Sequence, residues 1–364
     1  MKKLVTILIS SFIVLSCNEE NDITVKLGTG NLTNSGGGTS SSVYYTPTKA
    51  LKDASSFPIG IAMSQNQASS TNFTTIAKKE FNSVTAGNEM KFSTHSPTQG
   101  TYNWAPGDAI INFAQTNNMR VHGHTLIWHQ QVPTWVTNFT GTNAEFEAAI
   151  KTYVTDVVTH YKGKVASWDV VNEAFNEDGS LRSTIFSQKL GSNYITKIFQ
   201  WARAADPNAK LFYNDYNLES NVTKAEAAIA LINANPTLID GIGLQMHISL
   251  TSPSATVLNT IMDKVVATGK LVHFSELDIL VNPTGSVSSY DYATAIAQKN
   301  KYKEVFTIYK AKVPATQRFG ITIWGMRDVD SWLKTNGAGF PDFPLLFGDN
   351  YEYKIAHQGI LEAL

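Results

Sequence analysis

The chain has almost no cysteine and almost no net charge. Cys17 is the only cysteine among 364 residues, which excludes an internal disulfide. The 29 Lys and Arg residues nearly cancel the 30 Asp and Glu residues, so the formal net charge is −1. Because nucleic-acid binding requires a basic surface, no nucleic-acid partner is expected, and a neutral polymer fits this balance better.

Long hydrophobic runs are missing as well. The apolar stretch at residues 4–15 is shorter than the roughly 20 residues of a membrane span, and two lysines precede it, so residues 1–17 are predicted to be a signal peptide. Its last four residues, VLSC, resemble a bacterial lipobox, which implies lipidation of Cys17. An ordinary cleaved signal with an incidental cysteine is the alternative. The acidic residues that follow are similar to those of Bacteroidetes surface lipoproteins, which implies secretion and a lipid anchor in the outer membrane at the cell surface.

The segment after the signal lacks the apolar residues that a packed core needs. Residues 28–42 read GTGNLTNSGGGTSSS, and such a composition cannot offset the entropy of ordering the chain. Residues 18–47 are therefore predicted to be a flexible tether. From residue 48 to 364 there is no second linker and no short repeat, which indicates one folded domain.

That domain alternates strand-like and helix-like patterns, for example helical ones at 144–161 and 194–205. Short β-branched or aromatic runs between helices predict βα units and a parallel sheet. The predicted fold class is α/β, a single (β/α)8 TIM barrel. An open doubly wound sheet is the alternative, but no Gly-rich phosphate loop follows the first strand, and no cofactor is expected. The predicted strands are residues 59–63, 83–88, 120–128, 165–173, 210–217, 240–247, 271–279 and 318–325.

Polar side chains gather near the C-terminal ends of these strands. In a barrel that edge carries the active site, so polar residues at successive strand ends predict one shared pocket. The residues concerned are Asn88, His124, Asn172, Glu173, Asn214, Gln245, His247 and Glu276.

Two of these residues are carboxylates that end apolar strands. Glu173 follows SWDVVN in the fourth strand, and Glu276 lies within VHFSELDI in the seventh. Strands four and seven lie across a barrel from each other, so the two carboxylates are expected to face one another over a cleft. Acetal hydrolysis needs such a pair, because one group protonates the leaving oxygen while the other meets the developing positive charge.

Six segments in order resemble glycoside hydrolase family 10, the retaining xylanases: GHTLIWH, WDVVNE, YNDYN, QMH, SELDI, and WG followed by DSW. The resemblance implies a retaining endo-β-1,4-xylanase domain over residues 48–364, a monomer whose substrate is xylan or a xylo-oligosaccharide. It further implies that Glu173 is the acid/base, Glu276 the nucleophile, and His247 a support of Glu276 held by Asp278. Two other hypotheses stay open: a β-1,4-glucanase of the same clan, and a surface glycan-binding lipoprotein without turnover.

The resemblance also implies a set of sugar-binding residues. Asn172 corresponds to the asparagine that binds the sugar 2-hydroxyl, and Trp324 and Trp332 to the tryptophans that roof the cleft. The other expected contacts are Asn88, Lys91, His124, Trp128, Gln131, Asn214, Tyr216 and Gln245.

Two positions depart from the family pattern. Gly87 stands where most relatives carry Glu, which predicts the loss of one sugar contact, and Arg327 is expected to bring a cation near the cleft. His122, His124 and His129 lie close together in the sequence, a pattern that is found in zinc sites. In a strand, positions 122 and 124 share a face and 129 does not, so no metal site is predicted.

Overall fold

The computed structural model describes residues 42–335 and 340–364. The predicted signal peptide, the lipobox cysteine Cys17 and most of the predicted tether lie outside the described residues. Within the described part, no helix combines the length and the apolar character needed to cross a bilayer.

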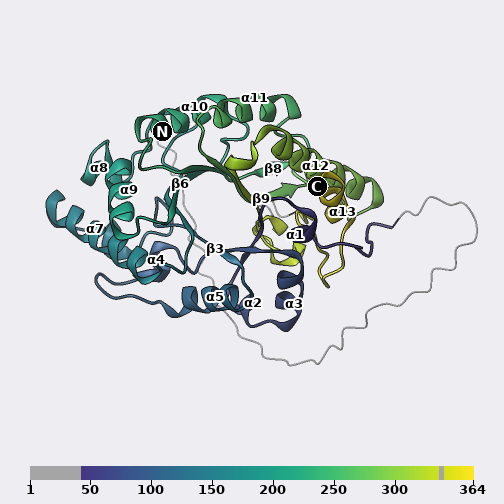
Figure 1. Cartoon of the computed structure of the whole chain (residues 1–364), viewed down its shortest axis with the longest axis horizontal. Helices are drawn as coiled ribbons and strands as arrows, with labels where there is room; N and C mark the ends of the chain where they lie inside the picture. The colour runs from purple at the N-terminus through teal and green to yellow at the C-terminus, as the bar shows by residue number, and fades with distance from the viewer. Residues whose placement is uncertain (1–41, 336–339) are drawn as a thin grey trace, which may run out of the picture. The chain divides into compact units, whose positions relative to one another are not determined.

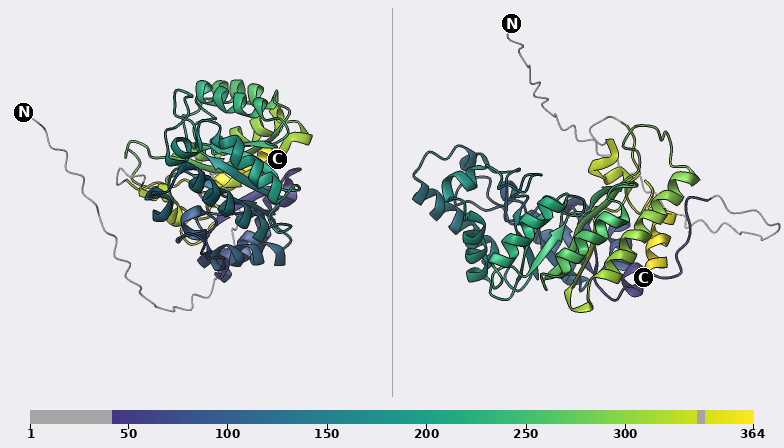
Figure 2. Two further views of the ribbon diagram at one scale, coloured as in Figure 1. Left: turned by 90° about the vertical axis from the view of Figure 1, so that its left-hand side faces the viewer. Right: turned by 90° about the horizontal axis from the view of Figure 1, so that it is seen from above.

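Eight parallel strands form a closed ring, which confirms the predicted TIM barrel. Each strand pairs with the next around the ring, and the last strand pairs with the first, with Ile59 opposite Ile321. The helices lie outside the strands (Figure 1), and Figure 2 shows this layering from two further sides. In ring order the strands are β1 (Ile59–Met63), β2 (Ser83–Ala86), β3 (Arg120–Gly123), β5 (Ser167–Asn172), β6 (Lys210–Asp215), β7 (Gly241–Leu244), β9 (Leu271–Leu280) and β10 (Arg318–Ile323).

Two predicted strands are each divided in the structure. Residues 120–128 split into β3 and the short β4 (Ile127–Trp128), which pairs with β5. Residues 240–247 split into β7 and the short β8 (His247–Ser249), because Met246 takes a left-handed backbone with φ +63° and interrupts the extended chain.

Several predicted strands also end earlier than expected. Glu173 and Asn217 have φ of +56° and +59°, a left-handed conformation that ends an extended strand. At these positions the chain turns out of the sheet at the mouth of the barrel. The first of these turns therefore coincides with Glu173, which the sequence singled out as functional.

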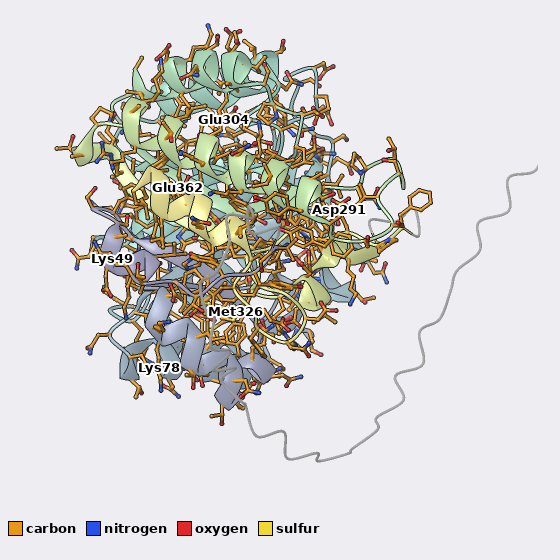
Figure 3. All side chains as sticks on the ribbon, turned by 90° about the vertical axis from the view of Figure 1, so that its right-hand side faces the viewer. Lys49, Lys78, Asp291, Glu304, Met326 and Glu362 are labelled. Atoms are coloured by element: carbon orange, nitrogen blue, oxygen red, sulfur yellow. The ribbon has the colours of Figure 1, made fainter. Side chains whose placement is uncertain are left out.

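The helices form the outer layer. Tyr194–Ala205 is helical with the predicted bounds, and the helix expected at 144–161 begins one residue earlier because Thr142 and Glu145 form a capping box. The last helix, α13, packs on α12, as Figure 3 shows near Glu362 and Glu304. The helices are α1 (Leu51–Ala54), α2 (Gln65–Ala68), α3 (Thr71–Glu80), α4 (Phe92–His95), α5 (Ala105–Thr116), α6 (Thr134–Thr137), α7 (Asn143–His160), α8 (Ile185–Leu190), α9 (Tyr194–Ala205), α10 (Val222–Ala234), α11 (Ala255–Val266), α12 (Tyr292–Lys312) and α13 (Ile355–Ala363), with 3-10 turns at η1 (Ala315–Gln317), η2 (Asp328–Asp330) and η3 (Trp332–Thr335).

Aromatic rings and histidines fill the interior of the barrel. His122 of β3 and His273 of β9 have ring centroids 4.8 Å apart although their strands are not neighbours, so both point to the barrel axis. Phe212 and Phe319 add a second cross-barrel contact at 4.5 Å. This filled interior forms a rigid floor beneath the C-terminal ends of the strands.

Candidate active site

A cavity of about 820 Å³ lies at the C-terminal ends of the barrel strands. Of the predicted catalytic and sugar-binding residues, all of which lie in the described part of the chain, Asn214 and Asp278 do not line it, and both bond to residues that do. The predicted residues along its wall are Asn88, Lys91, His124, Trp128, Gln131, Asn172, Glu173, Tyr216, Gln245, His247, Glu276, Trp324 and Trp332.

The two predicted catalytic carboxylates are joined by one continuous hydrogen-bond network. Gln245 Nε2 donates to Glu173 Oε1 at 3.0 Å and to Asn172 Oδ1 at 3.3 Å. Asn214 Nδ2 donates to the same Asn172 oxygen and to Glu276 Oε1, both at 2.8 Å. Glu173 and Glu276 are both buried. Three amides from β5, β6 and the turn after β7 therefore fix the two carboxylates relative to each other.

His247 connects Glu276 to Asp278. Its Nε2 lies 3.2 Å from Glu276 Oε2, and its Nδ1 lies 2.9 Å from Asp278 Oδ1. Trp332 Nε1 donates to the other Asp278 oxygen at 2.8 Å. Burial alone would lower the pKa of His247, but the charges and hydrogen bonds of Asp278 and Glu276 outweigh burial and raise this pKa well above its usual value. An imidazolium therefore lies beside the Glu276 carboxylate.

Glu276 is held in its ionised form. Burial tends to raise the pKa of its carboxyl, yet His124 and His247 outweigh burial and the pKa lies below its ordinary value. His124 lies 3.9 Å from Glu276 and is itself anchored by Asp169 at 2.9 Å. A buried carboxylate kept ionised by two imidazoles is suited to act as a nucleophile.

A second group of polar residues lies at the β2 side of the cavity. Lys91 Nζ and Gln131 Nε2 both donate to Asn88 Oδ1, at 3.1 and 3.2 Å, and Lys91 Nζ lies 4.9 Å from the centre of the Trp128 ring. Gly87 lines the cavity beside them, and a Cβ atom there would meet only the Met63 carbonyl at 3.7 Å. Position 87 therefore has room for a side chain, and its absence enlarges this end of the cavity.

Two tryptophans border the opposite side. Trp324 makes an edge contact with His124 at 5.4 Å, and Trp332 makes one with His247 at 5.1 Å. Trp332 is 60% exposed although its indole nitrogen is bonded, so its ring face is available to a ligand. An exposed indole face is suited to packing against the C–H face of a sugar.

The cavity wall also contains residues that the sequence analysis did not assign to the site, among them one in the loop after each of β4, β5 and β6. Arg182 lies in the loop after β5 and donates to the Glu173 carbonyl at 3.1 Å, Asn217 follows β6, and His129 Nδ1 lies 3.9 Å from Glu173 Oε2. His129 belongs to the segment GHTLIWH, but the sequence analysis treated this histidine only as a candidate metal ligand. No pattern in the sequence pointed to Arg182.

The expected cation at position 327 does not line the cavity. Arg327 forms a two-pronged ion pair at 2.7 and 2.8 Å with Asp330, which does line the cavity, and it stacks on Tyr351. The cation therefore lies next to the cavity wall, and the Asp330 carboxylate compensates its charge there. Across residues 42–335 and 340–364 there is no cluster of His, Cys, Asp and Glu suited to hold a metal ion.

Comparison with known proteins agrees with this geometry. The chain is similar to endo-beta-1,4-xylanase Xyn10C of Cellvibrio japonicus, with 41% identity over 341 residues, and to endo-1,4-beta-xylanase A of C. japonicus (strain Ueda107), with 38% identity over 348 residues. These matches cover 85% and 86% of this chain, and the chain spans 56% of the length of each relative.

Comparison with solved structures also finds xylanases. A solved mutant of xylanase10C from C. japonicus in complex with xylopentaose superimposes with a TM-score of 0.82 and 38% identity, covering 86% of this chain and 69% of that one. The family model described as glycosyl hydrolase family 10 matches residues 48–363. The chain belongs to glycosyl hydrolase family 10.

Proposed function

We propose that the chain is a retaining endo-β-1,4-xylanase. The observation that carries this proposal is the amide network that joins two buried carboxylates at the floor of the cleft. Membership of glycosyl hydrolase family 10 and the xylanase names of the relatives support xylan as the substrate. A xylo-oligosaccharide complex of a related structure supports binding of short xylan chains.

In the proposed reaction Glu276 is the nucleophile and Glu173 the acid/base. A Glu276 oxygen attacks the anomeric carbon, the bond to the leaving sugar breaks, and the leaving oxygen takes its electron pair and the Glu173 proton. Water then attacks the same carbon, Glu173 takes the water proton, and the ester to Glu276 is released. Two inversions at one carbon give net retention.

The remaining site residues are proposed to bind and orient the sugars. Asn172 has one oxygen shared by Asn214 and Gln245, which fixes its amide for the 2-hydroxyl of the sugar that reacts. His247, held by Asp278, keeps Glu276 ionised. Sugar contacts are proposed for Asn88, Lys91, His124, Trp128, Gln131, Asn214, Tyr216, Gln245, Trp324 and Trp332.

The test uses Glu276→Ala and Glu173→Ala on an aryl β-xylobioside with a good leaving group. Loss of the nucleophile should abolish turnover. Loss of the acid should spare the first step, because a good leaving group needs no proton, and added azide should restore the second step and give a β-xylobiosyl azide. Equal loss in both variants without azide rescue would contradict the assigned roles.

The substrate is tested by product analysis on xylan and on carboxymethyl cellulose. Faster release of reducing ends from xylan is expected, whereas faster release from the cellulose derivative would favour the β-1,4-glucanase. Binding of xylan without any release would favour the glycan-binding lipoprotein.

We also propose an organisation in which residues 1–17 are a lipoprotein signal, 18–47 a tether and 48–364 the catalytic domain. Lipidation of Cys17 would place a monomeric enzyme on the outer membrane at the cell surface. Labelling with a radioactive fatty acid tests this, because Cys17→Ser should abolish the label. An unchanged label would contradict the anchor.

A further inference from the structure

The acid/base residue lies on a turn with an unusual backbone. Glu173 has φ +56°, a sparsely populated region for a residue with a side chain. The backbone of this turn sets the direction of the Glu173 side chain. Because a left-handed backbone is unfavourable for glutamate, neighbouring groups must stabilise the turn. Both polar groups of the peptide that follows Glu173, the Ala174 amide and the Glu173 carbonyl, are bonded to side chains outside the catalytic network.

The first support acts on the peptide after Glu173. The Tyr213 hydroxyl accepts a hydrogen bond from the Ala174 amide at 3.0 Å and donates to Asp215 Oδ2 at 2.5 Å. Tyr213 and Asp215 are fully buried. Alternation along β6 places both on the face opposite to Asn214, which points to Glu276.

The second support comes from Arg182. Its Nε donates to the Glu173 carbonyl at 3.1 Å, and its Nη2 donates to the Phe175 carbonyl at 3.1 Å and to the Tyr216 hydroxyl at 3.0 Å. One guanidinium therefore bonds two carbonyls of the turn, and Tyr216 keeps it in place.

A single buried ion pair anchors both supports. Lys224 of α10 lies 3.0 Å from Asp215 and 3.4 Å from the centre of the Tyr216 ring, and it has no exposed surface. Asp215 also accepts from the Tyr216 amide at 2.9 Å. The pair thus orients Tyr213 on one side and Tyr216, with Arg182, on the other.

We infer that Tyr213 and Arg182, anchored by Asp215 and Lys224, are positioning residues for the proton donor Glu173. The inference rests on the proposed function. These residues do not contact the Glu276 carboxylate, which is held by His247 and Asn214. Weakening them should therefore impair proton donation and leave nucleophilic attack intact.

The experiment compares kcat/KM of the full chain and its variants on two substrates that differ only in the leaving group. Phenyl β-xylobioside needs protonation of its leaving oxygen, whereas 2,4-dinitrophenyl β-xylobioside does not. For Tyr213→Phe, and separately for Arg182→Lys, kcat/KM on the phenyl substrate should fall at least about tenfold. On the dinitrophenyl substrate it should change less than about threefold.

Tyr309→Phe is the matched control. The Tyr309 hydroxyl is equally buried and also donates once, to the Val272 carbonyl, and accepts once, from the Gly320 amide. In this variant the ratio of kcat/KM on the phenyl substrate to kcat/KM on the dinitrophenyl substrate should equal that of the wild type. Thermal unfolding of all variants shows whether they are folded to a similar extent.

The outcomes separate two kinds of failure. Equal losses on both substrates for Tyr213→Phe and Arg182→Lys, with the expected split for Glu173→Ala, would overturn the positioning role alone. A wild-type protein that cleaves neither xyloside, or a Glu173→Ala variant without the split, would overturn the proposed function instead.

Discussion

At the scale of single residues, His124 and His247 together lower the pKa of Glu276, and His247 is the one that bonds its carboxylate directly. The imidazole lies between two carboxylates whose attraction keeps it protonated, and its positive charge in turn lowers the pKa of Glu276. Asp278 is not bonded to Glu276 directly. It acts on Glu276 through His247, whose two ring nitrogens lie against the two carboxylates.

His247→Asn should shift the acidic limb of the kcat/KM profile to higher pH. Asparagine can donate a hydrogen bond but carries no charge, so the pKa of Glu276 rises and the nucleophile becomes protonated at a higher pH. The control is His160→Asn, which removes a histidine paired with Asp108 at 3.0 Å outside the cleft. An unmoved acidic limb in His247→Asn would show that this charge does not control Glu276.

Glu219 is a second residue whose ionisation has a measurable consequence. It lies beside His247 in a cavity of about 290 Å³, and its Oε2 is buried without a hydrogen-bond partner within the described part of the chain. Burial raises the pKa of its carboxyl from 4.5 to about 7. The folded state therefore binds this proton more tightly than the unfolded state does.

Between pH 4.5 and about 7, Glu219 should make the protein less stable as the pH rises. Unfolding by urea at several pH values should show that Glu219→Gln gains stability relative to the wild type over this window, by about 3 kcal/mol in total. Asp215 and Asp328, whose pKa values are also raised to about 6, contribute equally to both proteins. A difference in unfolding free energy that stays constant with pH would contradict this assignment.

At the scale of elements, two glycines of β7 make room for side chains of the neighbouring strand β6. A Cβ atom on Gly243 would lie 2.2 Å from Asn214 Oδ1, and one on Gly241 would lie 2.2 Å from the Phe212 ring. Both glycines leave space for β6 side chains that point into the barrel. One of these side chains bonds Glu276, and the other belongs to the barrel floor.

Alanine at these two positions should therefore have different effects. Gly243→Ala should displace Asn214 and lower kcat by about tenfold or more, because a small misplacement in the site is costly. Gly241→Ala should mainly reduce the unfolding free energy, by about 1–3 kcal/mol from overpacking, with kcat retained. Kinetics and urea unfolding of both variants test this, and equal effects on kcat would contradict it.

The same scale shows what could be predicted about the strands. The bounds of β1 and the starts of β2, β3, β6, β9 and β10 follow from apolar runs that begin after loop residues. The ends of β2, β3, β5, β6, β7 and β10 were predicted too late, and the end of β9 was predicted one residue too early. For β5, β6 and β7 the reason is that Glu173, Asn217 and Met246 adopt left-handed backbones, which tertiary bonds hold. Sequence patterns report burial along a strand and contain little information on where the chain leaves it.

At the scale of the whole domain, the last helix, α13, contacts α12 and α1 and is bonded to α3. His357 of α13 lies 3.1 Å from Glu80 of α3, and both are fully buried. Burial tends to raise the pKa of Glu80, but His357 and the Leu51 amide outweigh it, so the pKa is lowered. The contact joins elements that are 277 positions apart in the sequence.

His357→Leu should remove the buried histidine that faces the Glu80 carboxylate, while the Leu51 amide and the Tyr353 hydroxyl still donate to it, and should reduce the unfolding free energy by about 3 kcal/mol. Glu362→Ala on the same helix is the control, because its ion pairs with Lys299 and Lys303 lie at the surface and contribute less than about 1 kcal/mol. Urea unfolding of both variants measures the difference. Similar losses would show that the buried pair is not important for stability.

The sequence by itself determined the barrel, the two carboxylates and most of the cavity wall. A strand end in a closed parallel barrel fixes which residues meet, and this predicted the polar residues at the strand ends, including the two carboxylates. The remaining residues of the wall, such as Lys91, Gln131 and Trp332, were predicted from the resemblance to glycoside hydrolase family 10. Only the tertiary structure decided which groups hold those residues. Arg182 bonds the turn of Glu173, Arg327 pairs with Asp330 at the edge of the cleft, and Asn214 lies between Asn172 and Glu276. Such contacts depend on loop geometry and on distances of a few ångströms between separate elements, and no local pattern of residues specifies them.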